Sequence, residues 1–548
     1  MEEKRPPDQM VLMGKPQAYD ERPDTAWMGK EPAVAPQDIK QTVRADVIVV
    51  GAGIAGLCAA RAAAEEGVSV VLVEKSGHFN ARSGQYAVPG GKINEYFGRP
   101  AVDPDTVTDR FMRESGYKVK RPIISRWAKH ANEVFDWYIA AKPDMYIARR
   151  SDEQIPPEHR RFYLAPLSWP LPEAYDYTKE EFPVYRNSLI FVPGHAPLLK
   201  AILDMCTEKL GVRVYYGHAA EKLEQADGRF TGVLARDVKG GGYVRFEAKK
   251  SVILATGDNA GDPNIIRRFM PWVLENGIPL TPMRTNDLEG KLINTGDGLK
   301  MGARAGLRVQ QYHAVMSHNM GVMFMGMGTT PFLFLNKWGR RFMNECVPGQ
   351  QLQDQLEIQP DSTLYQVFDD NWRNQLQYMP PHHGSSCGYA GEDGPDFFGE
   401  HVTEKQFRLG LEKGVIVRGE TPEELFGKLD IDKEEALRSV QRYNELARSG
   451  HDDDFNKPAG RMFPLEKGPF YATTFGLSPM LCCIGGLESD ENCHVFAQDG
   501  NIVPGLYTAG NVMGNIYAGE YPICMRGLSH SMCMFYGYVA GKNAAGGI

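Results

Sequence analysis

The sequence predicts an α/β fold in which a parallel-sheet domain is divided by an inserted α+β region. Between Asp46 and Lys75 the chain reads as strand, glycine turn, helix and strand. A second apolar strand follows at 251–255, and the chain from Asn501 onward returns to strand, turn and helix. The residues between about 310 and 470 differ, because they are rich in Met and punctuated by Pro. An insertion between two halves of one sheet domain explains this order best.

Composition and charge narrow the class of protein. The chain has 548 residues, 42% of them hydrophobic and 24% charged, as in ordinary globular proteins of more than one domain. Its net charge of −8 does not favour nucleic acid as a partner. No apolar stretch is long enough to span a membrane, and the N-terminus lacks the apolar core of a secretory signal. Together with nine scattered cysteines, these features predict a cytoplasmic protein with reduced thiols and no metal site.

The glycine turn after the first strand has the spacing of a dinucleotide-binding motif. Gly51, Gly53 and Gly56 follow the apolar strand Val47–Val50 as G-x-G-x-x-G. The first glycine permits a tight turn, the second lets the backbone approach a pyrophosphate, and the third lets the helix pack on the strand. Since the helix begins at this turn, the phosphates would lie at a helix N-terminus. The motif therefore predicts a Rossmann-like dinucleotide site.

An acidic residue closes the second strand of this unit. Glu74 stands where its carboxylate can accept a hydrogen bond from a ribose hydroxyl, and Gly67 ends the preceding helix. The strand, the helix, the end of the helix and the acidic residue all occur at the spacing that a dinucleotide-binding unit requires. A bound dinucleotide explains them better than a βαβ unit with no ligand.

The order of these patterns divides the chain into parts. Residues 1–43 are expected to form an N-terminal extension, residues 44–312 and 475–548 the nucleotide-binding domain, and residues 313–474 a capping domain. Within the cap, Thr421 precedes Pro422 and Glu424 as in the capping box of a helix. The acidic run Asp452–Asp454 is expected to be a solvated loop.

Several motifs resemble those of the fumarate reductase and succinate dehydrogenase flavoprotein superfamily. They are VIVVGAGIAG with Glu74, ILATGD, NTGDGLKMGARAG, NKWGRRFMNE and the late GLYTAGN. The resemblance covers nearly all of the chain beyond the N-terminal extension. It implies an FAD-binding domain, an inserted capping domain, and an active site where the two meet at the flavin ring.

The same resemblance implies which residues hold FAD. In this sequence they are Gly51, Gly53, Ala55, Gly56, Glu74, Lys75, Arg82, Ser83, Gly90, Gly91, Ala219, Ala255, Thr256, Gly257, Asp297, Gly510, Asn511 and Leu528. Membrane-bound members carry a flavin-linked histidine in a motif like R-S-H-T-x-A-x-x-G-G. Residues 82–91 align with that motif without a gap and place Gly84 at the histidine. FAD is therefore expected to be bound non-covalently.

Most of the dicarboxylate clamp of the fumarate reductases is missing from this sequence. His318 matches a substrate-side histidine of that family. The family's catalytic arginine falls at Gly349, the histidine of its H-T-x-G-G motif at Cys482, and a carboxylate-binding arginine at Tyr521. Because arginines bind planar carboxylates through paired hydrogen bonds, a dicarboxylate would find few cationic partners here. Fumarate is therefore not the expected substrate.

An uncharged, methionine-rich stretch replaces the clamp. From Asn319 to Leu335 no side chain is charged, and four are Met, including Met325 and Met327. Methionine is flexible and polarisable, so it adapts to bulky apolar ligands, although ordinary core packing is the alternative. Met325, Met327, Cys482 and Arg526 are the expected lining of an apolar substrate pocket.

Tyr521 is the candidate catalytic acid or base. Tyr521-Pro522 follows GNVMGNIYAGE at a spacing similar to the Y-P motif of FAD-dependent 3-ketosteroid dehydrogenases and related enone reductases, whose tyrosine is catalytic. A phenol with a pKa of about 10 can protonate the carbon next to a carbonyl, or accept that proton in reverse. The G-x-G that follows in that family is absent here, and Gly349 stands where those dehydrogenases often have a second tyrosine. Packing on the flavin is the alternative role of Tyr521.

These observations predict an FAD-dependent oxidoreductase acting on a carbon–carbon bond conjugated to a carbonyl. In this hypothesis reduced FAD delivers hydride from N5 to the β-carbon, and Tyr521 supplies the proton at the α-carbon. His318 or a backbone amide polarises the carbonyl oxygen, and the helix N-terminus near Leu528 stabilises negative charge on the flavin. The expected substrate is bulky and apolar, such as a steroid-like 3-oxo-4-ene or an aromatic enone.

Two other functions stay open. One is a small enoate reductase of acrylate or fumarate type, which would bind a carboxylate through Arg526. The other is a non-catalytic flavoprotein that passes electrons within a larger assembly. The sequence contains no haem motif and no obvious second redox domain. Electrons are therefore expected to be exchanged with a nicotinamide nucleotide, free reduced flavin or a partner protein. His382 and His383 are more typical of a polar loop than of a metal site.

Overall fold

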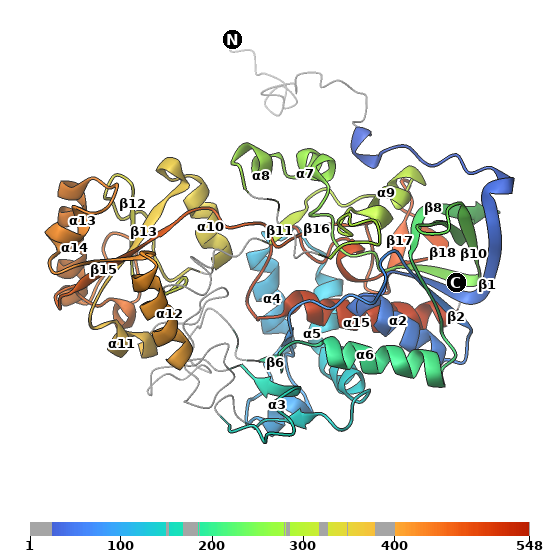
Figure 1. The fold of residues 1–548 in the computed structure, drawn as a ribbon, viewed down its shortest axis with the longest axis horizontal. Coiled ribbons are helices and arrows are strands. Elements are labelled where there is room, and N and C mark those ends of the chain that lie inside the picture. The colour runs from blue at the N-terminus through green and yellow to red at the C-terminus, as the bar shows by residue number, and fades with distance from the viewer. Residues whose placement is uncertain are drawn as a thin grey trace, which may run out of the picture.

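The computed structural model describes residues 25–149, 153–167, 185, 187–278, 280, 285–316, 327–347, 349–378 and 400–546. His318, Met325, His382 and His383 lie outside these described residues. The described chain forms two parts, which Figure 1 shows side by side. One holds a large sheet near the C-terminus, and the other is the yellow and orange lobe that corresponds to the middle of the chain.

A sheet of mostly parallel strands forms the core of the first part. In spatial order it contains β17 (His494–Phe496), β18 (Ile502–Thr508), β10 (Tyr243–Leu254), β1 (Ile39–Val50), β2 (Val70–Glu74) and β7 (Arg213–Tyr216). Neighbours along this path pair in parallel, except β17 with β18. β2 and the last residues of β1 are buried apolar runs, as expected for parallel strands covered on both faces. The predicted Rossmann-like α/β fold is confirmed.

β1 is longer than its apolar pattern indicates. It begins at Ile39 because its parallel partner β10 is also long and pairs with it from Tyr243 onward. The strand thus includes the end of the predicted N-terminal extension. Nearer the chain start, Trp27 is buried and packs edge-on against Phe269, with 5.2 Å between ring centroids. A hairpin of β8 (His218–Ala226) and β9 (Arg229–Asp237) pairs antiparallel with the first half of β10.

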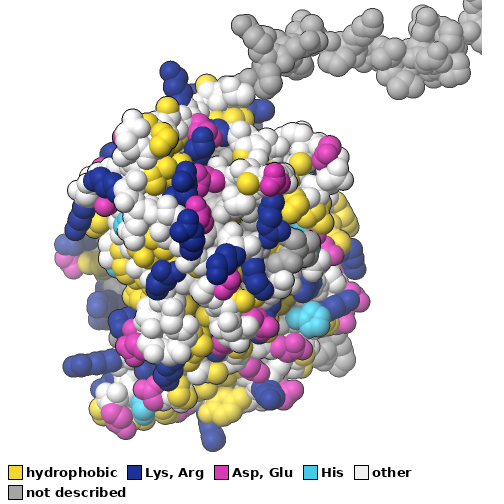
Figure 2. Space-filling view, turned by 90° about the vertical axis from the view of Figure 1, so that its right-hand side faces the viewer, with side chains coloured by type: hydrophobic (Ala, Val, Ile, Leu, Met, Phe, Trp, Pro, Cys, Tyr) yellow, Lys and Arg dark blue, Asp and Glu magenta, His cyan; other side chains and the backbone are white. Residues whose placement is uncertain are grey.

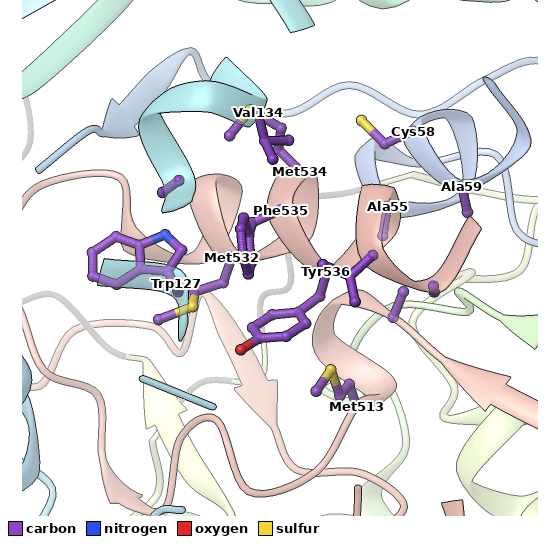
Figure 3. Close-up of a cluster of buried hydrophobic side chains, with 14 of the residues drawn as sticks. Ala55, Cys58, Ala59, Trp127, Val134, Met513, Met532, Met534, Phe535 and Tyr536 are labelled. Carbon is purple, nitrogen blue, oxygen red and sulfur yellow. The ribbon is translucent and has the colours of Figure 1, made fainter. Parts of the chain in front are cut away.

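Two helices approach each other so closely that glycine is required between them. α2 (Ile54–Glu65) follows the glycine turn, and α15 (Leu528–Gly546) is the last helix. A Cβ on Gly537 of α15 would lie 2.4 Å from the carbonyl oxygen of Ala55. Figure 3 shows Ala55 beside α15 and Trp127 in the same buried cluster. α15 has buried residues all around it, which explains why its sequence has no polar stripe.

Further helices and a small sheet surround this core. The helices are α3 (Lys92–Tyr96), α4 (Pro104–Glu114), α5 (Arg121–Ile139), α6 (Ala196–Asp204), α7 (Pro263–Phe269), α8 (Pro271–Glu275) and α9 (Asp297–Arg304). The small sheet has the order β3 (Gln85–Ala87), β6 (Ser188–Val192), β5 (Tyr163–Pro166) and β4 (Tyr146–Ile147). α5 packs against both α4 and α15.

The second part is built on a four-stranded antiparallel sheet. Its order is β12 (Leu333–Asn336), β13 (Leu364–Asp369), β15 (Phe470–Phe475) and β14 (Ile416–Gly419). The accompanying helices are α10 (Gly349–Glu357), α11 (Trp372–Gln375), α12 (Glu400–Glu412), α13 (Pro422–Phe426) and α14 (Lys433–Ser449). α13 begins with the predicted cap, since Thr421 Oγ1 accepts a hydrogen bond from the backbone N–H of Glu424 at 3.2 Å.

A three-stranded sheet connects the two parts. β11 (Ala314–Met316) pairs antiparallel with β16 (Cys482–Ile484) and parallel with β19 (Gly519–Glu520). β11 lies just after the expected start of the cap, yet both of its partners come from the last part of the chain. The division into domains stays a prediction. β11 lies near the predicted boundary between the nucleotide-binding domain and the capping domain.

Four charged side chains are buried together in the second part. Arg341 forms ion pairs with Glu345 at 2.8 Å and with Asp452 at 2.7 Å. Lys457 Nζ lies 3.2 Å from the carboxylate of Glu345 and donates to the carbonyl oxygen of Pro331 at 2.7 Å. Asp452 is only 2% exposed, so the prediction of a solvated loop is wrong for this residue. Its partner Arg341 is distant in sequence, and the acidic run alone does not reveal the pairing.

Candidate active site

The ends of four parallel strands meet at one edge of the large sheet. β1 ends at Val50, β2 at Glu74, β10 at Leu254 and β18 at Thr508. Most of the residues expected to hold FAD follow one of these ends, while Ala219 lies on β8, which contacts β2. Ligands of open α/β sheets bind at this edge. The fold therefore brings together segments that are far apart in the sequence.

The three glycines of the first turn have different structural roles. Gly51 has a φ of +106°, and a Cβ on it would lie 2.4 Å from the carbonyl oxygen of Ala255. A Cβ on Gly56 would lie 1.8 Å from the carbonyl oxygen of Gly51. Gly53, at the N-cap of α2, has no atom within 4 Å of that position. Internal packing thus requires two of the glycines, and the third leaves room for a pyrophosphate at the helix N-terminus.

Two acidic residues are held in place at this edge. Glu74 is buried, and its oxygens accept hydrogen bonds from the backbone N–H groups of Ala52 at 2.7 Å and Ser76 at 2.8 Å. Asp297, at the start of α9, forms an ion pair with Lys75 at 2.6 Å. Burial raises the pKa of Asp297, but the Lys75 ammonium together with the Thr295 hydroxyl and Lys300 keeps the pKa below its usual value. Asp297 is therefore a fixed carboxylate at neutral pH.

The turn after β10 presents a polar atom that a ligand could satisfy. Thr256 Oγ1 is buried and has no hydrogen-bond partner within the described part of the chain. Gly298 of α9 lies so close that a Cβ on it would be 2.3 Å from this oxygen. Gly257 has a φ of +79° and open space at its Cβ position. A buried hydroxyl without a partner is costly, so this turn fits a cofactor with phosphate or ribose oxygens.

Arg82 connects two segments of the site. Its guanidinium forms an ion pair with the buried carboxylate of Asp258 at 3.1 Å. Asn294 donates to the same carboxylate oxygen at 2.6 Å. Ser83 has a φ of +53°, an uncommon conformation for a residue with a side chain. These contacts hold the loop after β2 against the end of β10.

Gly84 occupies the position at which membrane-bound members of the resembled superfamily carry the flavin-linked histidine, and the packing around Gly84 leaves no room for a side chain. A Cβ on Gly84 would lie 2.5 Å from the carbonyl oxygen of Phe191. Non-covalent FAD is consistent with this packing. Gly90 and Gly91 are also explained by packing, because Cβ atoms on them would lie 2.8 Å and 2.6 Å from side-chain carbons of Ala101 and Asn132.

A buried chain of phenol and imidazole groups adjoins Arg82, and the sequence pattern gave no sign of it. The backbone N–H of Arg82 donates to His195 Nε2 at 3.3 Å. Burial holds the pKa of His195 well below its usual value, so the neutral ring carries its proton on Nδ1. That proton faces Tyr86 Oη at 3.3 Å, and Tyr86 Oη lies 2.8 Å from Tyr138 Oη. The ring of His530 lies 5.1 Å from that of His195.

The first turn of α15 holds the side chain of Tyr521. The backbone N–H of Ser529 donates to Tyr521 Oη at 2.9 Å, and Ser529 Oγ donates to Asn511 Oδ1 at 3.1 Å. Leu528 is fully buried at the start of the helix, and Gly510 has a φ of +73°. Hydrogen bonds of Ser529 thus link Asn511, a predicted FAD-binding residue after β18, and Tyr521 to the start of α15.

Tyr521 is a buried phenol with polar neighbours. It is 1% exposed, and burial raises its pKa well above the usual value. The nearby thiol of Cys482 adds to this shift, whereas the Ser529 N–H opposes it. The ring of Tyr517 lies 4.8 Å from the Tyr521 ring and is also buried. Tyr521 therefore remains a protonated phenol over the whole physiological pH range.

The expected pocket residues lie in different surroundings. Met327 is fully buried in a hydrophobic cluster with Phe368 and Trp372 of the second part. This placement agrees with ordinary core packing, the alternative to a role in lining a substrate pocket. Cys482 Sγ lies 3.2 Å from Met316 Sδ. Arg526 is buried, and burial lowers its pKa to about 10.

A pair of carboxyl groups lies between the two parts, and sequence reasoning missed it. The carboxyl group of Asp354 of α10 lies close enough to that of Glu520 of β19, directly before Tyr521, for each to affect the other's pKa. Burial and then the carboxylate of Glu357 raise the pKa of Asp354 to about 7. Burial and then Asp354 raise the pKa of Glu520 to about 8, while Lys118 opposes the shift. The only sequence signal was the acidic residue in the turn before Tyr521.

The parallel sheet, the glycine turn and the strand-end acid define a dinucleotide-binding fold. Residues 46–528 match the family model described as FAD binding domain, and the chain belongs to this family. FAD is its cofactor, and the chain is an FAD-dependent oxidoreductase of the class that acts on CH–CH groups.

Three curated relatives show how widely this family has diversified. The chain is 25% identical to the vinyl phenol reductase of Lactiplantibacillus plantarum, over 91% of this chain and 95% of that protein. It is 24% identical to the NADH:acrylate oxidoreductase of Vibrio harveyi, over 95% of this chain and 51% of that protein. It is 25% identical to the 3-oxosteroid 1-dehydrogenase of Mycolicibacterium smegmatis, over 91% of this chain and 97% of that protein.

A solved structure supports the fold. The 3-ketosteroid-Δ4-(5α)-dehydrogenase of Rhodococcus jostii superposes with a TM-score of 0.67 at 20% identity. The match covers 94% of this chain and all of that one.

The helices and the surface of the described residues indicate whether the chain carries a membrane span, a metal site or charged patches. Within the described ranges, no helix is long and apolar enough to cross a membrane, and no cluster of three metal-ligating side chains occurs. On the face drawn in Figure 2, basic and acidic side chains are intermixed.

Proposed function

We propose that this protein transfers hydrogen to or from a carbon–carbon bond conjugated to a carbonyl in a bulky, mostly apolar substrate. A steroid-like 3-oxo-4-ene or an aromatic enone is the expected substrate class. The observation that carries the proposal is the Tyr521 phenol, buried and held at the N-terminus of α15 by the Ser529 N–H. Reduction, rather than dehydrogenation, is the proposed physiological direction.

The surroundings of Tyr521 suit a proton donor. When bound, FAD supplies the hydride that complements the proton. Burial keeps the Tyr521 hydroxyl protonated, so the proton is present when the substrate arrives. After the proton leaves, the phenolate oxygen accepts the Ser529 N–H bond and lies at the positive end of a 19-residue helix. Both interactions are stronger with the anion than with the phenol, which lowers the cost of the transfer.

The remaining parts of the site complete this proposal. His318 is proposed to polarise the substrate carbonyl, and Met325 to line the pocket, although both lie outside the described residues. Cys482 and Tyr521 stand where fumarate reductases carry a histidine and an arginine, which argues against a dicarboxylate substrate. The electron donor or acceptor is proposed to be external, either a nicotinamide nucleotide, free reduced flavin or a partner protein.

The relatives support the type of reaction. Their names include a vinyl phenol, an acrylate and a 3-oxosteroid, and each of these compounds carries or gains a conjugated carbon–carbon double bond. At 24–25% identity they leave the substrate open. The neutral phenol of Tyr517 and the thiol of Cys482 beside Tyr521 favour an apolar substrate among these choices.

A small enoate is the second candidate substrate, because Arg526 is a buried guanidinium five residues from Tyr521. Burial lowers its pKa to about 10, so an anion nearby would strengthen its charged form. Competition by simple carboxylates against an apolar enone would favour this second candidate.

Anaerobic reoxidation of the reduced holoenzyme tests the proposal. The flavin absorbance would be followed against apolar enones, cinnamates, acrylate and fumarate. Rapid reoxidation by a steroid-like or aromatic enone is expected, and Tyr521→Phe should slow it by about 10²–10⁴-fold. Tyr538→Phe is the matched control, since Tyr538 lies on the same helix and packs against Trp137. Normal turnover of enones by a Tyr521→Phe protein that binds FAD would remove Tyr521 as the acid.

A further inference from the structure

Helix α4 presents three side chains to the segment that carries Tyr521. Phe111 lies three residues before Glu114 and Arg110 lies four before it, so all three are on one face of the helix. Arg110 and Phe111 are buried, and the side chain of Glu114 is 20% exposed. This face of α4 therefore packs inward, although none of its residues has a role in the reaction proposed above.

The carboxylate of Glu114 is shared between the helix and the chain after Tyr521. Arg110 Nε donates to one oxygen at 2.9 Å, and the backbone N–H of Ile523 donates to the other at 3.2 Å. Pro522 has no backbone N–H, so the Ile523 N–H is the first main-chain donor beyond Tyr521. Because Arg110 compensates the charge, the carboxylate can remain in this largely buried place as an acceptor for the loop.

The next residue of the loop is held from the same side. The guanidinium carbon of Arg110 lies 5.1 Å from the ring centre of Tyr185. The backbone N–H of Tyr185 in turn donates to the carbonyl oxygen of Cys524 at 2.7 Å. The ion pair on α4 is thus linked to the loop directly at Ile523 and, through Tyr185, at Cys524.

Phe111 supports the ring of Tyr521 from the same helix face. Its ring stacks on that of Tyr517 with 5.7 Å between centroids, and the Tyr517 ring lies 4.8 Å from the Tyr521 ring. On the N-terminal side, Glu520 of β19 pairs with Val315 of β11. The main chain around Tyr521 is therefore held by strand pairing before it and by α4 after it.

We propose that Glu114 is a positioning residue for proton transfer by Tyr521. This inference rests on the proposed function, in which Tyr521 is the acid. By accepting the Ile523 N–H, the carboxylate fixes the path of the main chain between Tyr521 and the Ser529 N–H that binds its hydroxyl. A displacement of about 1 Å can slow a transfer by about 10²-fold, because the donor and acceptor atoms must be correctly placed. Glu114 neither gains nor loses a proton in this role.

Two neutral substitutions of similar size test this role in the holoenzyme. Glu114→Gln retains an oxygen that can accept the Ile523 N–H, whereas Glu114→Met fills the space without a strong acceptor. Both remove the charge paired with Arg110, so any general loss of stability is common to the two variants. Glu114→Met is expected to lower kcat for enone reduction by about 10–100-fold relative to Glu114→Gln, with KM nearly unchanged. Asp109→Asn, which removes an exposed ion pair with Arg121 on the same helix, should leave kcat at the wild-type value.

A double-mutant cycle shows whether Glu114 acts through Tyr521. In the Tyr521→Phe background, Glu114→Met and Glu114→Gln should have equal kcat values, because the acid is already absent. Equal kcat values of the two variants in the wild-type background would overturn the positioning role, as would the same difference in both backgrounds. Full activity of Tyr521→Phe alone would instead refute the proposed function, so the two failures are distinguishable.

Amide hydrogen exchange of the wild-type holoenzyme tests the contact without any substitution. The Ile523 N–H should exchange with D₂O at least about 10-fold more slowly than exposed loop amides, because it is hydrogen-bonded to Glu114. An Ile523 amide that exchanges as fast as an unprotected one would overturn the proposal, even if Glu114→Met did not fold.

Discussion

Buried polar groups serve different purposes in the two parts of this molecule. In the second part, Arg341, Glu345, Asp452 and Lys457 form a network of opposite charges. In the first part, by contrast, the buried neighbours of Tyr521 include the phenol of Tyr517 and the thiol of Cys482, and the imidazole of His195 is buried near Arg82. Burial raises the pKa of Tyr521 and Cys482 and lowers that of His195. Each of these groups is therefore neutral.

This difference separates a structural role from a chemical one. Buried ions are tolerated when each finds a close partner, and such pairs change charge only at extreme pH. A buried neutral phenol retains a proton that it can transfer, and its anion is stabilised only by donors placed around it. The network in the second part suits a scaffold, whereas the surroundings of Tyr521 suit proton transfer.

The largest effect is expected from Asp452→Asn. Removing this carboxylate leaves the Arg341 guanidinium short of a buried partner, so the free energy of unfolding should fall by about 3–5 kcal/mol. Asp454→Asn, two residues along, removes only an exposed ion pair with Arg442 and should cost about 1 kcal/mol or less. Urea denaturation of both variants measures the difference. Equal losses would show that the buried network does not stabilise this part.

A smaller loss of stability is expected from Tyr86→Phe, which alters the buried chain of Tyr138, Tyr86 and His195 in the first part. The substitution leaves the Nδ1–H of His195 without its acceptor and removes the contact with Tyr138. One buried donor without a partner costs about 1–3 kcal/mol. Thermal unfolding should show this loss, while Tyr538→Phe on the surface of α15 should be nearly neutral. A stable Tyr86→Phe protein would mean that water replaces the hydroxyl.

The smallest effect concerns the carboxyl pair between the two parts. The folded-state pKa values of Asp354 and Glu520 are raised to about 7 and 8, above those of the unfolded chain. Stability from this pair is therefore fully present at acidic pH and is lost as pH rises through 7 and 8.

Asp354→Asn should flatten this dependence, by about 1–2 kcal/mol between pH 6 and 9. The exposed Asp105 offers a control substitution to Asn that should leave the pH dependence unchanged. Parallel curves for the wild type and Asp354→Asn would exclude a shared proton in the pair.

The sequence by itself determined the local features of this protein. The G-x-G-x-x-G turn, the acid at Glu74, the cap at Thr421 and the final helix from Leu528 all lie where their patterns predict them. Such features depend on neighbours within a few residues, since hydrogen-bond geometry and backbone conformation are set locally. The sequence also predicted a dinucleotide cofactor, because the glycine turn and the acid that would bind it are local features of this kind.

Only the tertiary structure decided which distant groups meet. Asp452 is buried because Arg341 reaches it across the fold, and Asp354 faces Glu520 because α10 packs near β19. The donor that holds Tyr521 is the backbone N–H of Ser529, which a spacing rule for one tyrosine does not include. Charge and proton chemistry depend on burial and on partners in space. These properties follow from packing between elements, and no single stretch of sequence contains them.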